Sequence, residues 1–169
     1  MRRNKINFKT KFMSNIYWSV YKNLEKGVVN LSYSIHIDDN QLNVYSSYIS
    51  DLILRASAEI ESISKELYKL NGGSKIKIKY DTDALEYLNN LWKLDLKVVI
   101  LSSINCFQTN KELKPFLKNE ISTFHGKQTY SWNNSYQNLK HDRANSLQYG
   151  SVKYLIDIMA SLYVLDSTN

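Results

Sequence analysis

An apolar stripe between residues 49 and 67 constrains the fold more than any other part of the sequence. Its members recur at spacings of three and four residues, the period of one face of an α-helix: Ile49, Leu52, Ile53, Ala56, Ile60, Ile63 and Leu67. Capping residues in segment 38–44 precede the stripe, and Asn71, Gly72 and Gly73 follow it. We therefore expect a long amphipathic helix that ends near Leu70 and buries this stripe in the core.

Weaker patterns predict the rest of a helical fold. Apolar residues at helical spacing indicate four more helices, over residues 11–26 (ending near Gly27), 83–92, 131–144 and 147–165. Alternation of apolar and polar residues predicts strands at 31–37 and 75–80, and the aliphatic run in 97–102 predicts a third short strand or extended segment. Residues 102–129 contain the only proline and have weak periodicity, which indicates a loop with room for one short helix.

These elements predict a mainly α fold, a bundle of about five helices with a small β element of two or three short strands. At 169 residues the chain has the length of one domain with a single core, so we expect one helical domain over residues 1–169, with a basic N-terminal arm. The longest aliphatic run, residues 98–101, is far too short to span a bilayer, and no membrane contact is expected.

The charge and the motifs narrow the function classes. Lys and Arg number 22 against 16 Asp and Glu, a formal charge of +6 that fits either a polyanionic partner such as RNA or a nucleotide, or simply a solvated basic surface. The single cysteine, Cys106, excludes an internal disulfide and a Cys-based zinc site, and the expected compartment is the cytoplasm. The sequence contains no HExxH motif, paired-carboxylate spacing or glycine-rich phosphate loop, so neither a metal nor a cofactor is expected.

The segment YQNLKHDR, residues 136–143, contains an Asn, a Lys, a His and an Arg within six residues. On a helix, Asn134, Asn138, His141 and Asn145 form one stripe, while Arg143 lies on the opposite, aromatic and apolar side. If the stripe faces water, it is an ordinary polar surface. If it faces a cleft or a second subunit, His141 with Asn138 and Lys140 is a candidate site, since histidine can move the 2′-hydroxyl proton in RNA cleavage while Arg or Lys stabilises the charged transition state.

Two charged pairs are predicted on the helix of the apolar stripe. Arg55 and Glu59 lie on one flank, and Glu61 and Lys65 form an i, i+4 pair on the other. We expect the Glu61–Lys65 pair to lie on the surface and contribute little to stability. Glu59 is the candidate to orient Arg55 toward the helix that carries His141.

Two segments together resemble the HEPN superfamily (higher eukaryotes and prokaryotes nucleotide-binding domains). They are LILRASAEIESISKELY at residues 52–68 and WNNSYQNLKHDRANSLQYGSVKYLIDIMASLYVL at residues 132–165, and they are similar to the family's early helix and its later helix pair. The family signature places an arginine four to six residues before a histidine. Here Arg143 follows His141, so Arg55 or Arg143 would have to supply the guanidinium in space.

The resemblance implies a small helical dimer that acts on RNA, in a bacterial toxin or anti-phage setting. His141 would be the acid/base group of a metal-independent endoribonuclease, Arg143 or Arg55 would contact phosphate, and the Asn134/Asn138/His141/Asn145 stripe would form the homodimer seam. The alternative is a catalytically inactive binding or protein-interaction module, either antitoxin-like or a partner subunit. The many tyrosines and tryptophans supply material for such an interface.

Overall fold

The computed structural model describes the backbone of residues 2–101 and 107–167, and the side chains of residues 16–101 and 107–167. Within these residues the α-helices are α1 (Arg2–Ser32), α2 (Ser47–Leu70), α3 (Glu86–Trp92), α4 (Ser131–His141) and α5 (Val152–Ser167). Short turns of other helix types add η1 (Tyr80–Leu85), η2 (Leu94–Leu96) and η3 (Leu147–Tyr149). Strand β1 (Val99–Leu101) pairs antiparallel with β2 (Lys111–Leu113), and β3 (Glu120–Ile121) with β4 (Gln128–Thr129). This confirms the mainly α fold with a small β element.

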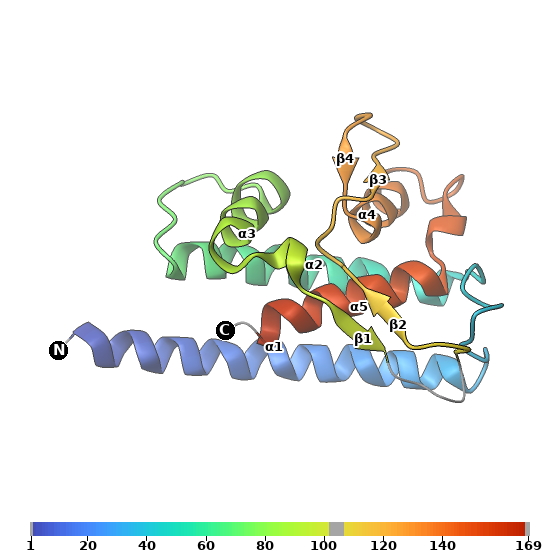
Figure 1. Ribbon diagram of the computed structural model, residues 1–169, viewed down its shortest axis with the longest axis horizontal. Helices are drawn as coiled ribbons and strands as arrows, with labels where there is room; N and C mark the ends of the chain where they lie inside the picture. The colour runs from blue at the N-terminus through green and yellow to red at the C-terminus, as the bar shows by residue number, and fades with distance from the viewer. Residues whose placement is uncertain (1, 102–106, 168–169) are drawn as a thin grey trace.

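The helices are arranged around a central pair. Helices α2 and α5 lie side by side, α1 packs along one side of them, and α3 and α4 lie on the other side (Figure 1). The β3–β4 hairpin stands over α4, while β1 and β2 lie nearer α1 and α5 (Figure 1). In the part of the chain that the structure describes, no helix combines the length and the apolar character that crossing a membrane requires.

The predicted apolar stripe is the centre of the core. All seven of its residues are buried, and α2 ends at Leu70 as predicted. The N-cap is Ser46, just after segment 38–44, whose side chain accepts a hydrogen bond of 3.1 Å from the backbone N–H of Ile49. On α5 the buried residues include Val152, Leu155, Met159 and Leu162, whereas Tyr163, predicted on the same apolar side, is exposed.

The first helix is longer than predicted, because Gly27 does not end it. Helix α1 runs from Arg2 to Ser32, so the basic N-terminal segment is helical, and Leu31 beyond the glycine is buried like Leu24 before it. A Cβ at Gly27 would lie 2.7 Å from a methyl group of Leu52, so the glycine allows α1 and α2 to approach closely. The strand predicted at 31–37 is therefore wrong, and Tyr33 within it is 84% exposed.

The strand predicted at 75–80 is also wrong. Ile76 is 95% exposed, so the alternating pattern does not mark a buried face. Instead, the carboxylate of Asp83 accepts hydrogen bonds from the backbone N–H of Lys79 (2.8 Å) and from Lys75 Nζ (2.6 Å). These contacts fold the segment into the turn η1, which occupies the start of the helix predicted over residues 83–92.

The region predicted as a loop at 102–129 contains strands in its described part. The 97–102 prediction is confirmed as the shorter β1, with its last residue outside the described residues, and β1 pairs with β2 so that Val99 lies opposite Leu113. Residues 122–127 close the β3–β4 hairpin, where Gly126 adopts a left-handed φ of 62° that favours glycine. Such short strands leave almost no periodicity in the sequence, which explains why the sequence analysis predicted a loop in this region.

Candidate functional site: a polar cleft beside helix α4

Helix α4 is fixed at its N-terminal end by a carboxylate from a neighbouring helix. Asp157 on α5 accepts hydrogen bonds from the Ser131 hydroxyl and from the backbone N–H of Trp132. Burial raises the pKa of this carboxyl, and the two hydrogen bonds partly offset the effect. The contact satisfies a free N–H of the first turn, so α5 sets where α4 begins.

The predicted polar stripe of α4 faces the β3–β4 hairpin. Asn134 and Asn138 are both buried. Asn138 Nδ2 donates to Thr123 Oγ1 at 2.8 Å, and Asn134 Nδ2 donates to Glu120 Oε2 at 3.1 Å. The backbone N–H of Thr123 in turn donates to Asn134 Oδ1 at 3.2 Å. The stripe is thus neither a water-facing surface nor a free seam at these positions, and the predicted homodimer seam is wrong there.

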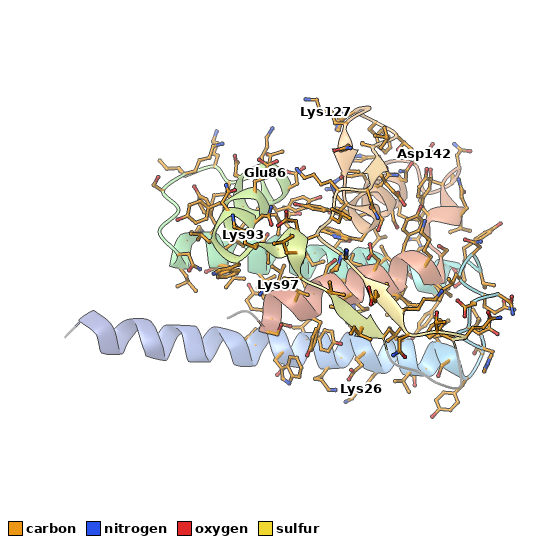
Figure 2. All side chains as sticks on the ribbon, viewed as in Figure 1. Lys26, Glu86, Lys93, Lys97, Lys127 and Asp142 are labelled. Carbon is orange, nitrogen blue, oxygen red and sulfur yellow. The ribbon has the colours of Figure 1, made fainter. Side chains whose placement is uncertain are left out.

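A polar cleft of about 830 Å³ opens between this hairpin and the start of α3. Its walls are formed by residues in 79–86 on one side and in 118–129 on the other, and α4 contributes Asn133, Asn134 and Gln137. Figure 2 shows Lys127 at the far end of the hairpin and Glu86 across from it on α3. A space of this size accommodates a ligand of about the size of a nucleotide.

The basic side chains of the cleft come from both walls. Lys79 lies on one wall, and Lys118, His125 and Lys127 lie on the other. Lys118 Nζ is paired with Glu86 Oε1 at 2.9 Å. Lys79 and Lys127 form no ion pair within the described residues, although Lys79 interacts electrostatically with Asp83 and the cleft is also lined by Asp81 and Glu86.

His141 lies at the rim of the cleft, one turn of α4 beyond Gln137. Its ring contacts Phe124 edge to face, with 5.6 Å between ring centroids, and its Nε2 lies 3.2 Å from Gln137 Oε1. Both contacting residues line the cleft. His141 is exposed, so its ring is open to a ligand that extends out of the cleft.

A chain of hydrogen bonds determines which nitrogen of His141 is free. Burial raises the pKa of Tyr80, so its hydroxyl stays protonated and donates to Asn133 Oδ1 at 2.6 Å. The hydroxyl oxygen of Tyr80 accepts a hydrogen bond from Gln137 Nε2 at 2.9 Å, which directs Gln137 Oε1 toward His141. The neutral imidazole therefore carries its hydrogen on Nε2, and Nδ1, which has no hydrogen-bond partner among the described residues, is left as an acceptor.

Replacing Tyr80 with Phe is expected to lower the free energy of unfolding by about 1–3 kcal/mol, because Asn133 Oδ1 and Gln137 Nε2 would lose their shared partner. Urea unfolding measures the change, with Tyr45→Phe on an exposed ring as the control. A Gln137→Leu variant completes a double-mutant cycle, and additive effects of the two changes would show that the hydroxyl and the amide do not interact.

The structure separates the predicted site residues. The guanidinium of Arg143 donates to Asp51 Oδ1 at 2.7 Å and to the carbonyl of Ser47 at 3.3 Å, so it is bound to the start of α2. Arg55 is exposed on α2, and none of the ion pairs between described residues joins it to Glu59, so the pair predicted to orient Arg55 is wrong. Glu59 instead lies near Asp166 of α5.

Other predictions in this region have mixed outcomes. Helix α4 ends at His141 rather than at 144, and Asn145 beyond it donates to Asp142 Oδ1 at 2.9 Å. Lys140 Nζ lies 5.2 Å from the centre of the Tyr136 ring. The Glu61–Lys65 pair is confirmed, with 2.6 Å between Lys65 Nζ and Glu61 Oε1.

Several residues that line the cleft, or support a lining residue as Tyr80 supports Gln137, escaped the sequence analysis: Tyr80, Lys118, Phe124, His125, Lys127 and Gln137. One signal was present, since Gln137 is one helical turn before His141 and therefore beside it. The others belong to the hairpin, to the segment just before it and to the turn η1, and the positions of all three depend on tertiary contacts. The described residues contain no group of three or more His, Cys, Asp or Glu side chains placed to hold a metal ion.

Comparisons with family models, with curated proteins and with solved structures find no match to the chain. The HEPN resemblance and the homodimer therefore stay predictions.

Proposed function

We propose that the protein acts on RNA, which it binds in the polar cleft, and that His141 serves as the acid/base group of a metal-independent cleavage. The observation that carries the proposal is the continuity of the site. The cleft has lysines on both walls, and it is also lined by Gln137 and Phe124, both of which contact the imidazole of His141. Phosphate binding by lysines and proton transfer by histidine are the two functions that this reaction needs.

The proposed reaction is an attack within the RNA strand. Nδ1 of His141 accepts the proton of a 2′-hydroxyl, and the 2′-oxygen forms a bond to the adjacent phosphorus. The bond from phosphorus to the 5′-oxygen breaks, and that oxygen takes a proton from the cationic form of His125, which lines the same cleft. Lys79 and Lys127 stabilise the charge on the phosphate oxygens. The products are a 2′,3′-cyclic phosphate and a 5′-hydroxyl.

A cleavage assay with EDTA present tests the proposal. We expect wild-type protein to cut total RNA and a labelled single-stranded RNA oligonucleotide, leaving cyclic phosphate ends, and His141→Ala to lose about 100-fold or more of the rate. His36→Ala is the matched control, because His36 is also exposed but lies between α1 and α2, in a segment that contributes no residue to the cleft. An oligonucleotide with 2′-deoxy sugars should stay intact. Equal rates for His141→Ala and the wild type would remove His141 from the mechanism.

A catalytically inactive binding module is the second candidate. One observation favours it. The guanidinium of Arg143, the arginine nearest to His141 in sequence, is bound to Asp51 and to the carbonyl of Ser47, and so it is not placed to contact a phosphate beside His141. The exposed aromatic cluster of Trp18 and Tyr163 with Tyr21, on α1 and α5, offers a surface for a partner protein. Wild-type protein that retains RNA in a filter-binding assay but never cuts it would support this second function.

A further inference from the structure

We propose that the polar cleft takes single-stranded RNA and holds one unpaired base against the ring of Phe124. This inference rests on the proposed function, because it names the substrate class of the same site. Phe124 lies in the turn of the β3–β4 hairpin, and its ring is 45% exposed although it lines the cleft. A large apolar ring left half in solvent, inside an otherwise polar site, is the kind of surface on which nucleic-acid bases stack.

The ring is held in place before any ligand binds. His141 contacts it edge to face, and the hairpin beneath it is fixed to α4 by the hydrogen bonds of Thr123 with Asn134 and Asn138. A rigid aromatic platform loses little conformational entropy when a base stacks on it. His125 and Lys127 follow Phe124 closely in the same turn, so a base on the ring would place its phosphates near both.

The shape of the cleft argues against a duplex. Its volume of about 830 Å³ is suited to one or two nucleotides. In an A-form helix the bases are stacked on each other and their faces are unavailable, so only an unpaired or splayed base reaches a side chain such as Phe124. The proposed cleavage makes the same demand, because the 2′-oxygen must align with the adjacent phosphorus, which a flexible single strand allows.

Fluorescence anisotropy tests the inference, with a labelled 12-nucleotide RNA that is used alone and annealed to its complement. The 2′-hydroxyls of this RNA are methylated, so that the proposed reaction cannot cleave it. Phe124→Ala is expected to weaken binding of the single strand about 10- to 100-fold. Binding of the duplex, which rests on lysine contacts alone, should stay within about twofold, and Phe124→Trp should keep or improve single-strand binding. Leu117→Ala is the matched control, because Leu117 is an equally exposed apolar side chain that does not line the cleft.

The outcomes distinguish failure of the Phe124 base platform from failure of the proposed function. Wild-type protein that binds single strand and duplex equally, or a Phe124→Ala variant that binds the single strand as the wild type does, would overturn the base platform while leaving RNA binding in place. A double Lys79→Ala, Lys127→Ala variant should weaken both RNAs, because its contacts are to phosphates. Wild-type protein that binds neither RNA would overturn the proposed function and the inference with it. Melting curves of each variant exclude loss of fold as the cause.

Discussion

Replacing Trp132 with Ala is expected to lower the free energy of unfolding by about 3–5 kcal/mol. Its side chain is fully buried, and the ring stacks on Tyr130 with 5.5 Å between centroids and an interplanar angle of 5°. Its Nε1 donates to the carbonyl of Pro115 at 2.9 Å, and Phe116 packs against it edge to face. Truncation leaves a large cavity and an unpaired carbonyl in the segment that leads into the hairpin.

Urea unfolding of the purified variants measures this change. Trp132→Phe keeps most of the volume and removes only the N–H donor, so its cost should be smaller, about 1–3 kcal/mol. Trp18→Ala is the control, since Trp18 is substantially exposed on α1 and should cost less than about 1 kcal/mol. Similar losses for Trp132→Ala and Trp18→Ala would contradict the role assigned to Trp132.

Because Trp132 connects α4 to residues 115 and 116, its loss should also affect the polar cleft. The hairpin that carries Phe124, His125 and Lys127 is joined to the body through this contact and through the Asn134 and Asn138 hydrogen bonds. A variant that is still folded at low temperature should therefore bind single-stranded RNA more weakly, even though Trp132 does not line the cleft. Core packing around Trp132 would in this way affect RNA binding through residues 115 and 116.

The sequence predicted the parts of the fold that depend on local periodicity. The stripe of α2 was found because every third or fourth residue from Ile49 to Leu67 is apolar and buried. The Glu61–Lys65 pair followed from the same period. The end of the first helix was predicted wrongly at Gly27, because a glycine can either end a helix or allow two helices to pack closely. Here it allows close packing against Leu52 of α2, a contact that the local sequence does not show.

The candidate site was predicted only in part, for a similar reason. Helical spacing correctly placed Asn134, Asn138 and His141 together on one side of α4. What faces that side is the β3–β4 hairpin, whose paired residues are so few that no alternation is visible in the sequence. Arg143 lies beyond the end of α4, so helical spacing does not place it, and its partner, Asp51, lies 92 residues away along the chain. The periodicity of one segment cannot identify partners that are brought together only by tertiary packing.

Replacing Asp166 with Asn is expected to stabilise the protein at pH 8 by about 1–3 kcal/mol and to stabilise it less at pH 5. The Asp166 side chain is 7% exposed near the end of α5, and neither carboxylate oxygen has a hydrogen-bond partner among the described residues. Burial, with a smaller contribution from the nearby Glu59, raises the pKa of Asp166 from 3.8 to about 7. Tyr17 and Tyr21 on α1 also lie close enough for its charge to raise the pKa of each.

The sign of the pH dependence follows from that shift. Between pH 4 and pH 7 the folded state holds the Asp166 proton while the unfolded state has lost it, so this group makes stability fall as pH rises and level off above about pH 7. The neutral amide of the Asn variant removes this slope. Urea unfolding at several pH values should therefore show the Asp166→Asn and wild-type stabilities diverging with pH, while Glu112→Gln, at an exposed carboxyl on β2, follows the wild type. If the stabilities of the Asp166→Asn variant and the wild type differed by the same amount at every pH, the buried carboxylate would have a stabilising partner. Helices α1, α2 and α5 would then tolerate its charge.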